Sequence, residues 1–277
     1  MGAPPTVSFS PRVLYNNPVK KQFLLVALVA PLFFSACATI PISGRRSFNI
    51  VPEDQEMALG IDAYKDIVTQ SKRSTDPVAT AMVQRVGERI ARVSHRPDYA
   101  WEYILIDDPK NQNAFCLPGG KVAVYTGILP ITKTETGLAV VLGHEIAHAI
   151  AKHGAERMSQ QLLINLGGES LEIALRKKPT ETRQAALQAF GLGATFGAVL
   201  PFGRNQESEA DRMGLIYMAQ AGYDPREALA FWQRMDAASS GQAPPQFMST
   251  HPSHETRVRD LEKWLPEAEQ IFQTSPH

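Results

Sequence analysis

The sequence predicts an α+β fold that is mostly α-helical, with a small antiparallel sheet beside one central helix. Apolar residues recur at helical spacing in several segments, most regularly over residues 77–94. Residues 114–117 and 121–125 have the composition of two strands, and Pro118-Gly119-Gly120 between them is typical of a turn. With 277 residues, 44% of them hydrophobic, the chain can form one large domain or two small ones.

The expected elements place the strands before the central helix. Residues 37–52 contain Pro and Gly at intervals and are expected to form an extended linker. Asp76 can cap the second helix, and Gly167-Gly168 is expected to end the central one. The pattern predicts helices over 54–72 and 77–94, strands over 101–106, 114–117 and 121–125, and helices over 134–164, 205–221, 224–235 and 251–264.

Residues 1–36 are predicted to be a signal peptide of the bacterial lipoprotein type. Lys20 and Lys21 precede an apolar run over 23–34 that is too short for a comfortable membrane span. Ser35-Ala36-Cys37 then resembles a lipoprotein cleavage site, which predicts lipidation of Cys37. An uncleaved signal anchor is the alternative, and residues 1–17 look dispensable to either interpretation.

Residues 184–203 carry no formal charge, but their four glycines and one proline argue against a simple membrane span. The favoured interpretation is a helix and loop of small residues packed near the functional site. A mobile lid or a segment that dips into a membrane is the alternative.

The pentapeptide His144-Glu145-Ile146-Ala147-His148 is the most specific pattern in the chain. Histidines at positions i and i+4 lie one turn apart on one helical face, so both imidazoles can bind one zinc ion. Glu145 lies on the same turn, where a carboxylate can polarise a water molecule. The alternative is a surface helix that happens to carry two histidines.

A catalytic zinc site needs a third protein ligand and leaves a further position open. His153 comes too early on the helix for the third histidine of a metzincin and is expected to be structural or to support a ligand. Glu207 is the best candidate, and Asp211, on the same helical face, can accept the outer N–H of a ligand histidine. Glu209 is expected to point away from that face. An ordinary solvated acidic helix is the alternative.

The composition excludes several other functions. Lys and Arg together number 28, as do Asp and Glu, so no basic excess indicates nucleic acid binding. The sequence has neither a zinc-ribbon cysteine spacing nor a phosphate-binding glycine loop. Cys116 has no recognisable partner histidine in a catalytic pattern and is expected to be a small buried residue.

Four segments together resemble the gluzincin metallopeptidases, which include the CAAX prenyl protease, the heat-shock protease HtpX, the mitochondrial Oma-type protease and periplasmic lipoprotein-type proteases. The segments occur in the family's order, and the resemblance extends over roughly residues 40–265. They are Asn113-Ala114-Phe115 with Pro118-Gly119-Gly120, the motif from His144 to His148, residues 207–211, and Thr250-His251-Pro252 with Arg257.

The resemblance implies a zincin-like fold and a zinc metalloendopeptidase with one zinc ion per chain. His144, His148 and Glu207 would bind the metal, Glu145 would act as general base, and Asp211 would support a ligand. The resemblance adds two further catalytic candidates. His251 matches a histidine that approaches the metal in some members and can occupy the open position, and Arg257 matches an arginine proposed to stabilise the transition state.

The lipoprotein-like N-terminus resembles the periplasmic branch of the family. This predicts an envelope protease held on a membrane by a lipid, with the outer membrane favoured, that degrades unfolded or misassembled proteins. A chaperone or assembly factor for outer-membrane proteins, with a self-inhibited site, is the alternative. A structural zinc site is a third interpretation, but it leaves Glu145 unexplained.

An extended substrate is expected to add as a strand to the sheet edge near residues 114–117 or 121–125. The expected organisation is a signal peptide over 1–36, a linker over 37–52, a zinc metallopeptidase domain over 53–265 and a C-terminal tail over 266–277.

Overall fold

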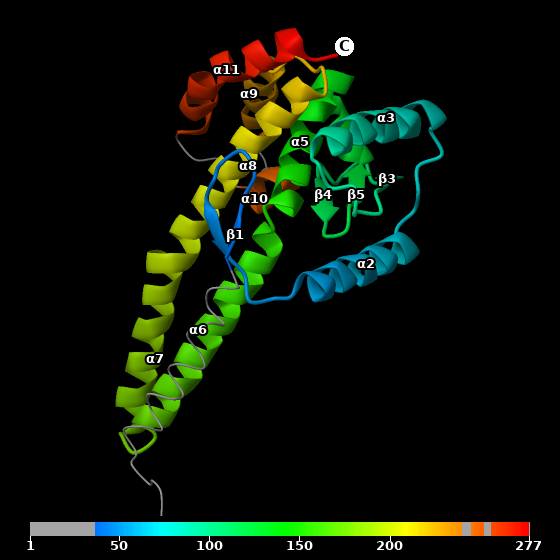
Figure 1. Ribbon diagram of the computed structural model, residues 1–277. Coiled ribbons are helices and arrows are strands. Elements are labelled where there is room, and N and C mark those ends of the chain that lie inside the picture. Colours follow the sequence, from blue (N-terminus) through cyan, green and yellow to red (C-terminus); the bar gives the residue numbers. More distant parts are fainter. Residues whose placement is uncertain (1–36, 240–244, 252–255, 277) are drawn as a thin grey trace, which may run out of the picture. The chain divides into compact units, whose positions relative to one another are not determined.

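The computed structural model describes residues 37–239, 245–251 and 256–276 (Figure 1). The signal peptide predicted over 1–36 therefore lies outside the described residues. The first elements are the hairpin of β1 (Cys37–Thr39) and β2 (Arg46–Phe48), then α2 (Glu53–Gln70) and α3 (Pro77–Val93). Asp76 caps α3 as expected, because its carboxylate accepts hydrogen bonds from the N–H groups of Val78 and Ala79.

A three-stranded sheet follows, made of β3 (Glu102–Ile106), β4 (Ala114–Leu117) and β5 (Lys121–Tyr125). Its strand order is β3-β5-β4, with β5 antiparallel to β4 and parallel to β3. The sheet is therefore mixed, whereas an antiparallel one was expected. The loop over 107–113 carries the chain to the far edge, and the tight turn at Gly119-Gly120, both at positive φ, returns β5 into the middle.

The helix α5 (Glu135–Ile150) is the centre of the fold and follows η1 (Thr126–Ile128) and α4 (Leu129–Thr132). All its residues from Gly137 onward are buried. It packs against α3, β4, α8 and α9. A helix that is buried on every side carries few polar residues, so the polar side chains of His144, Glu145 and His148 stand out. The predicted fold, mostly helical with a small sheet beside the motif helix, is confirmed.

The central helix ends earlier than predicted. The chain leaves helical geometry at Lys152, which has a φ of 55°, and α6 begins at His153 and continues to Leu175. Gly167-Gly168 does not end a helix but lies inside α6. A Cβ atom at Gly167 would lie 2.9 Å from the ring of Phe190, so this glycine allows the next helix to pack closely.

The uncharged stretch 184–203 is an exposed helix, which contradicts the expectation that it packs near the site. It covers most of α7 (Thr180–Ala194), the short π-helical turn η2 (Thr195–Val199) and the start of α8 (Leu200–Gln220). Figure 1 shows α6 and α7 running side by side. The helix is continuous over 180–220, and its most apolar stretch has a mean hydropathy of 1.4 and no buried residue. By length and composition alone, this helix could cross a membrane.

Three helices complete the described chain: α9 (Glu227–Ser239), α10 (Gln246–Thr250) and α11 (Arg257–Thr274). The last helix runs past the predicted end at residue 264 and contains Pro266. Phe231, Trp232 and Phe247 form a buried aromatic cluster between these segments and α5. This cluster places the end of α10 against the motif helix.

Candidate metal centre

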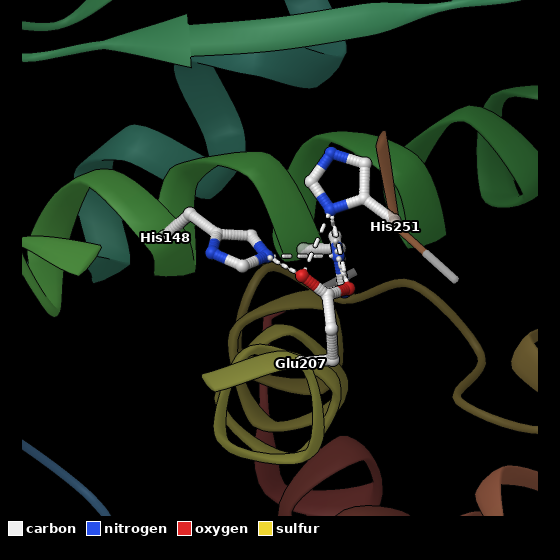
Figure 2. A group of neighbouring side chains, drawn as sticks. His148, Glu207 and His251 are labelled. Carbon is white, nitrogen blue, oxygen red and sulfur yellow. Dashed lines mark hydrogen bonds and ion pairs between the residues drawn. The ribbon is translucent and has the colours of Figure 1, made fainter. Parts of the chain in front are cut away.

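Four side chains that could hold a metal ion converge beside α5. His144 and His148 come from α5, Glu207 from α8, and His251 from the residue after α10. Their ligand atoms all lie within 4.8 Å of one another. Figure 2 shows His148, Glu207 and His251 pointing toward one shared point. The structure thus brings together three segments that are far apart in the sequence.

The nitrogens of the two motif histidines face each other across this point. The Nε2 atoms of His144 and His148 are 3.1 Å apart. Each lies 3.4 Å from one carboxylate oxygen of Glu207. The Nδ1 atom of His251 lies 3.3 Å from His144 Nε2 and 3.2 Å from both oxygens of Glu207.

The close crossing of α5 and α8 allows this convergence. Gly143 and Gly214 meet at the crossing, where a Cβ atom on Gly214 would lie 2.7 Å from the backbone nitrogen of His144. Because neither residue has a side chain, the helices approach closely enough for Glu207 and Asp211 to reach His144. The crossing therefore sets the geometry of the site.

Asp211 and Arg257 form a buried layer behind the convergent atoms. One oxygen of Asp211 lies 2.9 Å from His144 Nδ1, and the other accepts a 2.6 Å hydrogen bond from Arg257 Nε. Arg257 Nη2 also donates to Glu207 at 3.2 Å, and its guanidinium stacks 3.9 Å above the ring of Trp232. Arg257, which is only 1% exposed, thus bridges two buried carboxylates with its single positive charge.

Glu209 does not point away into solvent, contrary to prediction, but is buried on the other side of α8. It contacts His153 Nε2 at 2.9 Å and Arg45 Nη2 at 2.7 Å. The start of α6 and the turn between β1 and β2 cover this side of the helix, so both faces of α8 are buried here. Helical periodicity separates the two faces correctly but does not reveal that a second segment covers the outer one.

His153 does not join the convergent ligand atoms but contacts a motif histidine. Its Nδ1 atom lies 2.8 Å from Nδ1 of His148. The break at Lys152 turns the ring of His153 back toward α5, which an uninterrupted helix would not do. No pattern in the sequence identifies Arg45 as part of this layer.

Glu145 lies beside the convergent atoms and is 3% exposed. Its carboxylate is 3.3 Å from Nε2 of His251. Burial raises the pKa of Glu145 above its ordinary value, and the nearby His251 and His144 only partly oppose this shift. A raised pKa makes a carboxylate a stronger base, which suits a group that takes a proton from water.

The charges of the site fit a bound cation. Burial alone would raise the pKa of Glu207, yet the three facing histidines hold it well below its ordinary value. Burial alone would lower the pKa of His144, yet Asp211 and Glu207 raise it to about 10. Without a metal, a proton must therefore separate His144 from Glu207. Two imidazoles and a carboxylate at this spacing are a donor set that suits zinc.

Cys116 is buried within β4 and is a free cysteine. Burial raises the pKa of its thiol well above the ordinary value, so that the thiolate is strongly disfavoured. This agrees with the expectation that Cys116 is a packing residue.

Comparison with known proteins identifies a peptidase family and several relatives. Residues 77–265 match peptidase family M48. The chain is 42% identical to the mitochondrial metalloendopeptidase OMA1 of Schizosaccharomyces pombe, over 95% of this chain and 80% of that protein. It is 30% identical to the corresponding protein of Saccharomyces cerevisiae, over 97% and 80%. The beta-barrel assembly-enhancing protease of Escherichia coli is 27% identical, over 86% of this chain and 49% of that protein.

The predicted location in a bacterial periplasm is wrong. The relatives from the two yeasts and a third from Arabidopsis thaliana, at 30–42% identity, are mitochondrial proteins, which points to a mitochondrial location. The expected lipid anchor at Cys37 depended on the bacterial assignment and loses its basis. Residues 1–52 contain no Asp or Glu but carry Arg12, Lys20, Lys21, Arg45 and Arg46. Mitochondrial transit peptides are likewise poor in acidic residues.

Proposed function

This chain belongs to peptidase family M48 and is a metalloendopeptidase, and on that premise we propose that it is a zinc enzyme that cleaves proteins in mitochondria. His144, His148 and Glu207 would bind one zinc ion per chain. The observation that supports this most directly is the approach of the two Nε2 atoms to each other and to the Glu207 carboxylate. Bound zinc would polarise the scissile carbonyl and acidify the attacking water.

Glu145 would be the general base. Its carboxylate takes a proton from the attacking water and passes it to the leaving amine when the peptide bond breaks. The burial that raises its pKa supports this role, because the same group must bind and release a proton in each cycle. Asp211 would hold His144 with Nδ1 protonated, so that Nε2 faces the metal.

His251 would occupy the fourth position around the metal in a resting state. Its Nδ1 atom lies 3.3 Å from Nε2 of His144 and 3.2 Å from a carboxylate oxygen of Glu207. These distances are similar to the 3.1 Å between the Nε2 atoms of the two motif histidines. The segment over 245–251 must then move before a substrate can bind. After that movement His251 would help to stabilise the oxyanion of the tetrahedral intermediate. Arg257 would add positive charge at the same site through its contact with Glu207.

Extended, unfolded proteins are the substrates that we propose, consistent with a role in protein quality control. A substrate strand could add to β4, which lies at an edge of the sheet and packs against α5. The alternative edge at β5 fails, because β5 is paired on both sides. Main-chain pairing of this kind recognises an extended backbone with little dependence on side chains.

A second candidate function is that of an assembly factor whose protease site is held shut. The presence of His251 among the ligand atoms supports it, and the name of the Escherichia coli relative couples a protease to beta-barrel assembly. Both functions can reside in one protein, so the two must be separated by experiment.

The decisive experiment compares the unsubstituted chain with Glu145→Gln and His251→Ala. We expect about one zinc ion per chain in all three, measured by elemental analysis. Casein cleavage should fall by about 100-fold or more in Glu145→Gln, because the base is lost while the ligands remain. His251→Ala should cleave casein faster than the unsubstituted chain if blocking of the site by His251 lowers the rate more than its contact with the oxyanion raises it.

Three outcomes would contradict the proposal. An absence of zinc from the unsubstituted chain would exclude the ligand assignment. Full zinc occupancy without cleavage, in His251→Ala as well, would instead favour the assembly factor. Retention of activity by Glu145→Gln would exclude Glu145 as the base.

A further inference from the structure

Behind His148 lies a chain of buried polar contacts that the proposed reaction does not use. His148 Nδ1 meets His153 Nδ1 at 2.8 Å, and His153 Nε2 meets Glu209 Oε2 at 2.9 Å. Glu209 in turn accepts from Arg45 Nε at 2.9 Å and Nη2 at 2.7 Å, and also from the hydroxyl of Ser43. We call this the Arg45–Glu209–His153 relay.

The relay is anchored at the turn between β1 and β2. Arg45 also binds Glu156 on α6, with contacts of 2.8 and 3.0 Å. Glu156 accepts a further 2.8 Å hydrogen bond from Gln206. His153 is fully buried and Glu209 is 9% exposed, so water competes little for these contacts.

The direction of each hydrogen bond follows from the donors and acceptors available. The carboxylate of Glu209 faces a guanidinium and can only accept, so Nε2 of His153 must carry a hydrogen. A neutral His153 then has a bare Nδ1 that can only accept. The hydrogen between the two rings therefore belongs to Nδ1 of His148. This assignment leaves the lone pair of His148 on Nε2, which is the atom that faces Glu207.

We propose that His153 is a positioning residue that fixes the Nδ1–H tautomer and the ring orientation of His148, so that Nε2 stays available to the metal. Glu209 and Arg45 keep the acceptor nitrogen of His153 facing His148. The inference rests on the proposed zinc site. His144 and His148 are then held by separate partners, Asp211 for the first and the relay for the second.

This arrangement makes the N-terminal hairpin part of the support of the metal centre. Arg45 and Ser43 precede α5 by about a hundred residues in the sequence, yet they contact the carboxylate that orients His153. Partners of this kind typically change metal affinity by about 10- to 100-fold when they are removed.

The test compares His153→Leu, which removes the acceptor, with His153→Asn, whose side-chain oxygen can replace Nδ1 as an acceptor. The zinc dissociation constant is measured by competition with a chromophoric chelator, and the visible spectrum of the Co²⁺-loaded chain reports ligand geometry. Thermal unfolding of each metal-free variant shows whether the fold is retained. His95→Asn, at an exposed histidine in another part of the chain, is the matched control.

We expect His153→Leu to weaken zinc binding by about 10- to 100-fold and to alter the Co²⁺ spectrum. His153→Asn should stay within about threefold of the unsubstituted chain, and His95→Asn should not differ from it. If His153→Leu does not fold, Glu209→Gln decides the question. Its amide can donate to His153 and permit the reversed tautomer, so zinc binding should weaken by about tenfold.

Equal zinc affinity and an unchanged Co²⁺ spectrum in a folded His153→Leu variant would overturn the inference. So would an equal loss in His153→Asn and His153→Leu, because ring packing rather than the acceptor would then be responsible. If the unsubstituted chain binds no zinc, the proposed function fails and the inference fails with it. If the unsubstituted chain binds zinc normally and the variants bind it equally well, the inference fails but the proposed function stands.

Discussion

His144 is the residue at which proton binding and metal binding compete. Burial by itself disfavours the charged imidazole, but Asp211 and Glu207 reverse this effect and raise the pKa to about 10. His148 differs, because burial lowers its pKa well below the ordinary value and the nearby His144 adds to that effect. In the metal-free chain at neutral pH, His144 therefore holds a proton that a metal ion must displace.

Zinc affinity should consequently increase with pH. Because the proton on His144 must leave before the metal binds, the affinity should rise by about tenfold per pH unit between about pH 7 and pH 10. Calorimetry in buffers with different ionisation enthalpies should detect about one proton released per zinc ion at neutral pH. Asp211→Asn removes a group that raises the pKa of His144, so this variant should release less.

A zinc affinity that does not change over this pH range would contradict the assignment of the proton. The same conclusion would follow if Asp211→Asn and the unsubstituted chain released equal numbers of protons.

The pair α5 and α8 is the element that builds the site. One helix supplies two imidazoles and the other supplies Glu207, Asp211 and Glu209. Their separation is set at Gly143 and Gly214, where a Cβ atom on either residue would lie within 2.8 Å of the other helix. Packed interiors do not absorb such an overlap without moving the backbone.

Gly214→Ala should therefore damage both the fold and the metal centre. Overpacking of this kind costs about 1–3 kcal/mol of unfolding free energy, and a shift of α8 should move Glu207 away from the histidines. Gly203→Ala is the matched control, because a Cβ atom there meets nothing within 4 Å in the same helix. That change should leave stability equal or raise it by up to about 1 kcal/mol.

Chemical denaturation and chelator competition on both variants would check this prediction. If Gly214→Ala matched Gly203→Ala in stability and in zinc affinity, the crossing would not control the site.

At the scale of the whole molecule, the metal centre joins segments that are distant in the chain. His144 and Glu207 are separated by the paired helices α6 and α7, and His251 follows the aromatic cluster at α9 and α10. The relay adds the N-terminal hairpin to this set. A metal ion that binds the folded chain in preference to the unfolded one stabilises the whole unit.

Removal of zinc should lower the melting temperature. With free zinc at a hundredfold excess over the dissociation constant, binding adds about 2.7 kcal/mol of stability. For a unit of this size that corresponds to a shift of about 5–10 °C. Thermal unfolding with and without a chelator measures it, and Glu207→Gln, which lacks a charged ligand, should show a smaller difference. A chelator effect of equal size in that variant would place the bound metal elsewhere.

The sequence by itself determined the residues that converge and the family to which the chain belongs. His144 and His148 are one helical turn apart, as are Glu207 and Asp211, and such local periodicity holds wherever a helix is placed. The strand–turn–strand segment and the cap at Asp76 follow from equally local preferences.

Only the tertiary structure decided which faces are covered and how distant segments pair. The mixed sheet depends on where the loop over 107–113 carries β4, and the burial of Glu209 depends on a hairpin more than 160 residues earlier. The break at Lys152 turns His153 toward His148, and the exposed α7 lies beside α6 instead of the site. These features arise from contacts between segments remote in the sequence, and the periodicity of a single helix or strand contains no information about its neighbours.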